Sequence, residues 1–240
     1  MHDTFPTLEK TVFIVTYGRS GSTLVQNMLN ALPGACVRGE NENLLAPLAR
    51  DWAVLVHSAQ AAKMRATAKR SLPSDPWYGY EAISADAFGQ ALAHAFLSTV
   101  LRPGPDTRII GFKEIRWHHD PALFPVMLDF LRKFFPNPHF VFNLRDHDAV
   151  CRSGWWQDVA PAVVKRTLHE AEQLYAAYSA RNPEFCLTLR YDDYVQRPVA
   201  WKALFDFLGE SFDQDKVDAV MNEKLRHLQP NREADPPRDA

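Results

Sequence analysis

The chain has 240 residues, of which 46% are hydrophobic and 23% charged, and its formal net charge is −2. This length suits one large α/β domain or two small ones, and the composition is ordinary for a globular protein. A nearly neutral chain has no overall basic field for nucleic acid or anionic membranes, so an anion site must be a local cluster. No apolar stretch approaches the roughly 20 residues that span a bilayer, and the N-terminus has no apolar signal core, so we expect a cytoplasmic protein.

A loop with two glycines, between a strand and a helix, is the first distinctive feature of the chain. Residues 11–16 (TVFIVT) predict a strand, and residues 22–31 predict a helix that begins directly after the loop. In such a loop the backbone N–H groups converge, and the helix dipole adds partial positive charge. Arg19 adds a guanidinium whose fork geometry suits a phosphate or sulfonate. We therefore predict an anion site made of Gly18, Arg19, Ser20, Gly21, Ser22 and Thr23.

The same loop differs from the P-loop of enzymes that bind nucleoside triphosphates. A P-loop has a lysine directly before its Ser/Thr, and uses both together with Mg²⁺. Here Ser22 and Thr23 follow Gly21 directly, so no lysine occupies that place. A turn that binds no ligand is the plainer alternative, although the polar side chains at the helix mouth favour an anion.

Strands and helices alternate along the rest of the chain. Apolar runs predict further strands at 35–38, 108–112, 139–144 and 185–190. Helices are expected at 42–70 (one or two), 85–101, 121–135, 148–156, 161–180, 198–208 and 213–227, with a loop at 71–80. This order predicts an α/β fold of three layers, in which helices flank a mostly parallel central sheet of about five strands. We expect a single domain at 1–228 with a helical insertion around 42–106, and a frayed tail at 229–240.

Charged side chains follow the predicted strands at their carboxyl ends, where open parallel sheets bind ligands. Glu40 and Glu42 follow the second strand, Lys113 the third and Arg145 the fourth. Together with Arg19, the two later cations would hold a doubly anionic ligand at one sheet edge. Surface ion pairs of these cations, and placement of the glutamates at a helix N-terminus, are the alternatives.

Neither the cysteines nor the histidines form a recognisable disulfide or metal motif. Cys36, Cys151 and Cys186 lie far apart in apolar neighbourhoods, which favours buried free thiols. His118 and His119 are adjacent, and adjacent side chains on an extended segment point to opposite faces. Since no further ligand is suggested near them, we predict no metal site.

The loop YGRSGST at 17–23 and the sequence RDHDAVCRS at 145–153 resemble the sulfotransferases that use 3′-phosphoadenosine 5′-phosphosulfate (PAPS). The segments GFKEIR at 111–116 and LRYDDYVQRPVAWKALFDFLG at 189–209 also resemble family segments, although YDDY differs from the family's YED. The resemblance runs from about residue 11 to 209 and is nearest to the bacterial, carbohydrate and tyrosyl-protein branches. It implies a fold like that of P-loop nucleoside-triphosphate hydrolases.

The resemblance also implies roles for the nucleotide-binding residues. The first loop would cradle the 5′-phosphosulfate of PAPS, with Arg19 as its main cation. Arg145 and Ser153 would hold the 3′-phosphate. A basic C-terminal loop that often covers the 3′-phosphate in the family is not clearly recognisable, and its candidates here are Lys224, Arg226 and Arg232.

The implied reaction moves a sulfuryl group to a hydroxyl, or in second place to an amine, of a small-molecule or glycan acceptor. Lys113 would stabilise the bridging oxygen, and Glu40 would be the general base with Glu42 in reserve. The segments 42–106 and 116–138, which include Trp52 and Trp117, are expected to wall the acceptor pocket. A P-loop kinase or a non-catalytic nucleotide-binding module are the rival interpretations, and the oligomeric state stays open.

Overall fold

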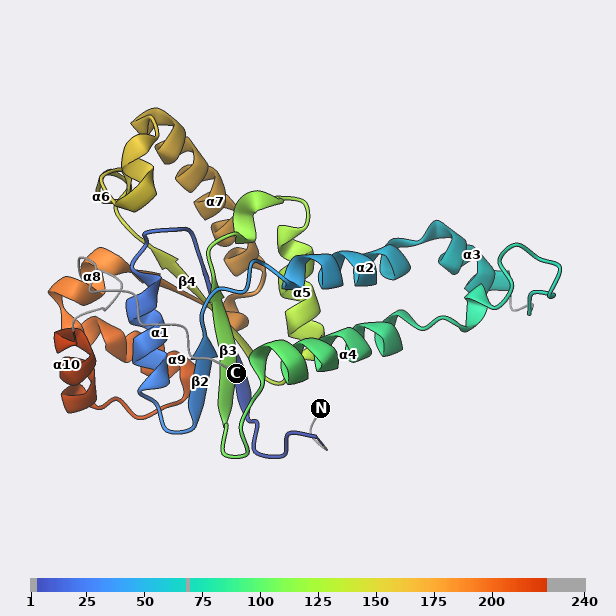
Figure 1. Ribbon diagram of the computed structural model, residues 1–240, viewed down its shortest axis with the longest axis horizontal. Helices are drawn as coiled ribbons and strands as arrows, with labels where there is room; N and C mark the ends of the chain where they lie inside the picture. The colour runs from blue at the N-terminus through green and yellow to red at the C-terminus, as the bar shows by residue number, and fades with distance from the viewer. Residues whose placement is uncertain (1–3, 68–69, 224–240) are drawn as a thin grey trace, which may run out of the picture.

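A five-stranded sheet forms the centre of the computed structural model, which describes residues 4–67 and 70–223 (Figure 1). Every strand pairing is parallel, and the strand order is β2-β3-β1-β4-β5. This confirms the predicted α/β fold, and it brings the carboxyl ends of the strands to one edge. The strands are β1 (Lys10–Thr16), β2 (Ala35–Arg38), β3 (Ile109–Glu114), β4 (Pro138–Leu144) and β5 (Cys186–Arg190).

Helices cover both faces of the sheet, as the near-continuous apolar strands require. One face carries α1 (Ser22–Asn30), α8 (Tyr191–Gln196), α9 (Lys202–Leu208) and α10 (Gln214–Asn222) (Figure 1). The other carries α2 (Leu45–His57), α4 (Ala85–Phe96), α5 (Phe124–Phe134) and α7 (Pro161–Arg181), with the short α6 (His147–Cys151) beside α7. With α3 (Ala59–Thr67), the helices α2 and α4 form an arm that extends away from the sheet (Figure 1).

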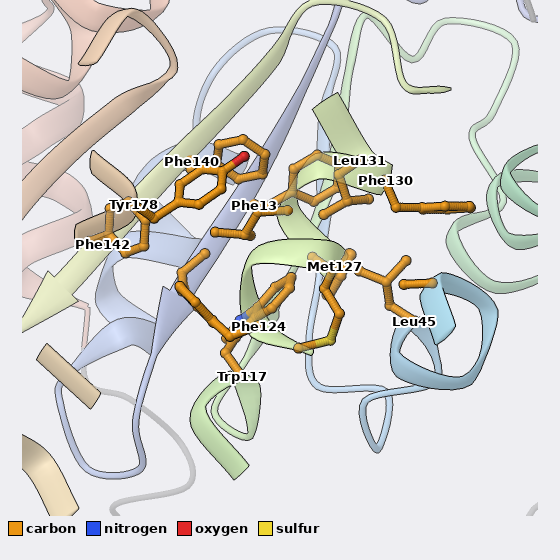
Figure 2. Packing of buried hydrophobic residues seen from close by; sticks show 14 of the residues in the cluster. Phe13, Leu45, Trp117, Phe124, Met127, Phe130, Leu131, Phe140, Phe142 and Tyr178 are labelled. Atoms are coloured by element: carbon orange, nitrogen blue, oxygen red, sulfur yellow. The ribbon is translucent and has the colours of Figure 1, made fainter. Parts of the chain in front are cut away.

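The two faces of β1 belong to two separate apolar clusters, because successive side chains of a strand point in opposite directions. Val12 and Ile14 pack with α1 and α9, whereas Phe13 and Val15 pack with the α5 and α7 side. Figure 2 shows the second cluster, in which Phe13 lies among the rings of α5 and β4. The Phe13 ring centroid lies 5.8 Å from that of Phe140.

Two tryptophans expected at the acceptor pocket belong instead to this apolar cluster. Trp117 is fully buried, stacks on Phe112 at 5.6 Å and donates from Nε1 to the carbonyl of Ile14. Trp52 is 8% exposed and packs edge-on against Phe130 of α5. Large aromatic rings stabilise a fold most when they are buried, so these two side chains pack in the core and not at a pocket.

Several element boundaries differ from the predicted ones. The strand β3 continues to Glu114, so Lys113 belongs to the strand and not to the loop after it. The helix predicted at 148–156 is divided into α6 and a 3-10 helix, Gly154–Asp158, because the backbone is extended at Ser153 and left-handed at Gly154. The helix at 121–135 begins only at Phe124, after a 3-10 turn at Trp117–His119.

Smaller differences concern helix ends. The helix predicted at 85–101 finishes as a π-helix, Leu97–Leu101, and the one at 198–208 starts as a 3-10 helix, Pro198–Trp201. Residues 42–70 hold two helices, α2 and α3, and α8 was not predicted at all. The predicted tail at 229–240, the end of the last predicted helix, and Lys224, Arg226 and Arg232 lie outside the described residues.

The three cysteines are free, as predicted. Cys151 is buried, whereas Cys36 and Cys186 are only half-buried, so full burial was wrong for two of them. Burial raises the pKa of Cys186 to about 11, which disfavours a reactive thiolate there. Within residues 4–67 and 70–223, no helix combines the length and apolarity that crossing a membrane requires.

An ion cluster at the amino edge of the sheet joins it to the segment after α9. Glu210 lies 2.8 Å from Lys10 Nζ and 2.8 Å from Arg108 Nη2, and its side chain is 11% exposed. Arg108 also pairs with the more exposed Glu9. Hydrogen bonds from Arg108 and Lys10 lower the pKa of Glu210 to about 2.

We predict that Glu210→Gln lowers the free energy of unfolding by about 2 kcal/mol at pH 7, because charge-assisted hydrogen bonds are lost. A carboxylate with a lowered pKa stabilises the fold above its unfolded-state pKa of about 4.3 and loses this effect as the pH falls toward 2. The difference between wild type and variant in urea unfolding should therefore shrink between about pH 4.3 and pH 2. Glu9→Gln is the matched control and should cost less than about 1 kcal/mol. A difference that grows on acidification would contradict this account.

Candidate active site

A cavity of about 280 Å³ opens at the carboxyl edge of the sheet. Its walls come from the ends of all five strands, which is where open parallel sheets bind ligands. Three basic side chains and one carboxylate face the same space. The lining residues are Gly18, Arg19, Gly21, Ser22, Thr23, Leu24, Glu40, Lys113, Ile115, Arg145, Trp155 and Tyr191.

The predicted anion loop bends sharply into α1. Gly21 is the N-cap of α1 and has a φ of 84°, and a Cβ at this position would collide with the ring of Tyr191. Arg19 has a φ of 67°, a left-handed conformation that strains a non-glycine residue. The first N–H groups of a helix have no acceptor within the helix, so the first turn of α1, at Ser22 and Thr23, offers donors to the cavity.

Arg19 is held by the segment that follows α6. Its Nε donates to Ser153 Oγ at 3.0 Å, and its guanidinium lies 5.9 Å from the ring centroid of Trp155. Gly154 leaves room for this contact, since a Cβ there would meet the Arg19 side chain. The arginine of the first predicted motif and the serine of the second therefore touch directly. Ser153 supports Arg19 from beside the cavity and does not line it.

Arg145, directly after β4, also contacts the anion loop. Its Nη1 donates to the carbonyl of Arg19 at 2.9 Å, and its guanidinium lies 4.3 Å from the ring centroid of Tyr191. Its Nε is buried and has no hydrogen-bond partner among the described residues. The backbone N–H of Arg145 donates to the hydroxyl of Tyr17, which in turn donates to Glu172. Burial raises the pKa of Tyr17, so this hydroxyl keeps its proton.

Ser20 holds the anion loop in place through buried hydrogen bonds. Its side chain is fully buried, and its Oγ lies 2.7 Å from the hydroxyl of Thr16. Its carbonyl accepts from Asn143 Nδ2, and Asn143 Oδ1 accepts from the hydroxyl of Tyr194. This network ties the loop to β1, β4 and α8, and Ser20 does not line the cavity.

The predicted base and the predicted lysine form an ion pair. Lys113 Nζ lies 2.6 Å from Glu40 Oε1, and Arg116 Nη1 lies 3.4 Å from Glu40 Oε2. The Lys113 side chain is 8% exposed and that of Glu40 33% exposed. Glu42 is exposed, has a φ of 57° and does not line the cavity. The structure thus brings Glu40, and not Glu42, next to the cations.

A second cavity, of about 780 Å³, lies between α7 and the 3-10 turn Trp117–His119. It is lined by His118, His119, Pro121, Trp156, Thr167, Glu170, Ala171, Gln173 and Leu174. The two histidine rings pack 4.9 Å apart, so the expected extended segment with opposed side chains was wrong. Burial lowers the pKa of His118 to about 4, which keeps the ring neutral near pH 7. In the described part of the chain, no cluster of three or more His, Cys, Asp or Glu could hold a metal ion.

Two aromatic walls of the first cavity had no assigned role in the sequence. Tyr191 follows β5 directly, so the rule that ligands bind after strand ends could have singled it out. The side chain of Trp155 is exposed and its ring lies beside the guanidinium of Arg19. Flat rings beside guanidinium groups hold these cations in place without neutralising them.

Comparison with known proteins places the chain in a family. A likeness in fold is found to the sulfotransferase domain of the Synechococcus PCC 7002 olefin synthase, with 19% identity, a TM-score of 0.58, and coverage of 93% of this chain and 81% of that one. A sulfotransferase domain from the curacin biosynthetic pathway gives 16% identity, a TM-score of 0.55, and coverage of 90% and 79%. Among proteins of curated function, no sequence matches. Residues 11–214 match the sequence model of the sulfotransferase family, and the chain therefore belongs to this family.

Proposed function

We propose that this sulfotransferase moves a sulfuryl group from PAPS to a hydroxyl, or in second place to an amine, with Glu40 as the general base. The observation that carries the proposal is the convergence of Arg19, Arg145 and Lys113 on one cavity that Glu40 also lines. Such a site matches a ligand with anionic groups at both ends and a reacting group beside a base.

The donor groups of the cavity fit the nucleotide. Arg19 and the first turn of α1 suit the 5′-phosphosulfate, because they combine a guanidinium with unpaired backbone N–H groups. Arg145 suits the 3′-phosphate, since its buried Nε lacks an acceptor among the described residues and an anion would supply one. Ser153 lies beside the cavity and accepts from Arg19, so it first orients this guanidinium, and the 3′-phosphate role that the resemblance implies for it would use its remaining hydroxyl hydrogen.

When bound, PAPS supplies the sulfuryl group and a nucleotide leaving group. The acceptor oxygen forms a bond to sulfur, the bond from sulfur to the bridging oxygen breaks, and Glu40 takes the proton of the acceptor hydroxyl. Lys113 supplies positive charge for the bridging oxygen, and Arg19 for the phosphosulfate. Catalysis then depends on positioning and fixed charge, as in phosphoryl transfer.

The ion pair of Glu40 with Lys113 supports this division of roles. It sets a base and a cation side by side before any ligand arrives. The sulfuryl group carries negative charge, so it competes with Glu40 for the ammonium of Lys113. As Lys113 turns to the bridging oxygen, Glu40 is freed to accept a proton.

The acceptor would approach from the β2–β3 side, where Glu40 lies. Ile115 lines the first cavity and His118, three residues later, lines the second. Likewise, Trp155 lines the first cavity and the next residue, Trp156, lines the second. Two chain segments therefore border both cavities. The apolar Pro121, Trp156 and Leu174, together with polar side chains and a neutral His118, suit a small-molecule or glycan acceptor. We also infer one domain over 1–228 with the 42–106 arm as an insertion, and a cytoplasmic enzyme, which the free thiols support.

We predict that Arg19→Ala and Arg145→Ala each weaken the binding of PAP, the desulfated nucleotide, by roughly 10- to 100-fold, because each loses charge-assisted hydrogen bonds. Isothermal titration calorimetry with PAP measures this directly. Arg181→Ala, at the exposed end of α7, is the matched control and should bind as the wild type does. Wild-type protein that gives no heat with PAP, or wild-type affinity in both cavity variants, would remove the nucleotide site.

We predict that Glu40→Gln slows sulfate transfer by roughly 10²–10⁴-fold while PAP affinity is kept, because the amide cannot accept the proton. The assay incubates the enzyme with PAPS and a panel of phenols, sugars and amines, and detects the mass gain of one SO₃ group. Glu184→Gln, at an exposed turn, is the control. If Glu42→Gln stops transfer and Glu40→Gln does not, the base is misassigned. PAP binding with no transfer to any acceptor would favour a non-catalytic module.

A further inference from the structure

Glu114, the last residue of β3, is a carboxylate with no exposure to solvent. Its Oε1 accepts from the backbone N–H of Ile115 at 2.8 Å and of Arg116 at 3.1 Å. The same oxygen accepts from Arg116 Nη1 at 2.8 Å. One carboxylate oxygen is thus used to shape the end of its own strand.

The other oxygen holds a different part of the chain. Oε2 of Glu114 accepts from the backbone N–H of Asn43 at 2.8 Å and of Asn41 at 3.3 Å. Glu42, which lies between these two residues, has a φ of 57°, and so does Asn43 itself. Left-handed residues turn successive N–H groups toward one point and create an anion-binding concavity. Here the anion is a side chain of the neighbouring strand.

This contact begins where the sheet ladder stops. The pairing of β2 with β3 ends at Arg38 and Phe112, whereas β3 runs on to Glu114. No ladder pair therefore fixes residues 39–43, although this segment carries Glu40. Beyond the last ladder pair, hydrogen bonds to the carboxylate of Glu114 connect this segment to the end of β3.

We propose that Glu114 is a positioning residue that sets Glu40 against Lys113. This rests on the proposed function, in which Glu40 is the base. Consecutive residues of β3 hold the same segment: Lys113 pairs with the carboxylate of Glu40, and Glu114 binds the backbone just after it. Arg116 contacts both carboxylates.

Glu114 does not itself accept the proton. A carboxylate offers about four lone-pair sites, and five N–H groups already point at this one. It is buried and does not line the cavity. Its effect on the reaction therefore passes through Glu40.

The first test is hydrogen–deuterium exchange on the wild-type protein, which needs neither a variant nor turnover. The amides of Asn41 and Asn43 should exchange slowly for a loop, because a buried carboxylate binds them. The amides of Leu72 and Ser74 are the internal reference, because both residues are exposed and neither amide has an acceptor among the described residues. Exchange of the Asn41 and Asn43 amides as fast as these two would overturn the proposal, whatever the nucleotide experiments give.

The second test is Glu114→Gln, whose amide places an NH₂ where the carboxylate accepted hydrogen bonds. We expect faster exchange in 40–44, unchanged PAP affinity by calorimetry, and PAPS turnover lowered by roughly 10- to 100-fold. In a Glu40→Gln background the same substitution should cause no further loss, because both act through one group. Additive losses, an equal loss of PAP affinity, or wild-type turnover would each overturn the positioning role. Failure of wild type to bind PAP would instead overturn the proposed function, and leave the exchange result to decide the contact itself.

Discussion

Two guanidinium groups of like charge lie together at the carboxyl edge of the sheet, and the rest of the site depends on how the fold keeps them there. Arg145 donates to the carbonyl of Arg19, and Arg19 donates to Ser153, so each holds a partner other than an acidic side chain. Tyr191 and Trp155 cover their faces without cancelling their charge. An acidic partner on either arginine would offset its charge and weaken its attraction for an anion. Their mutual repulsion is offset by the hydrogen bonds of Arg145 to the loop after β1 and of Arg19 to the segment after α6.

The three glutamates near the site differ from one another in their surroundings. Glu40, Glu42 and Glu114 lie within one small region, and the structure gives each a different environment. Glu114 is buried and saturated with N–H donors, Glu42 is exposed, and Glu40 alone shares the cavity with the cations. Environment rather than residue type separates the three carboxylates, as it does in other enzymes with several acidic groups. Arg19 and Arg145, which we propose bind the nucleotide, and Glu40, which we propose accepts a proton, thereby follow different strands of one sheet.

Much of this could be predicted from the sequence, because the apolar runs and the glycine loop are local signals. All five strands, their parallel arrangement and the approach of Arg19, Lys113 and Arg145 to one edge follow from such signals and the strand-end rule. The particular side-chain contacts between distant segments were not predictable. Nothing local indicates that Trp117 turns into the core, or that Glu42 and Asn43 adopt left-handed backbone around the carboxylate of Glu114. The spacing of apolar residues indicates which side chains are buried, but it does not indicate which residues they contact.

The central claim is that the cavity at the sheet edge clasps both ends of one nucleotide. A crystal structure of the protein with PAP tests it most directly. The account predicts the 3′-phosphate within hydrogen-bond distance of Arg145, with its orphan Nε now partnered, and the 5′-phosphate against the first turn of α1 beside Arg19. PAP bound elsewhere, or PAP in the cavity with Arg145 Nε still lacking a partner, would contradict it.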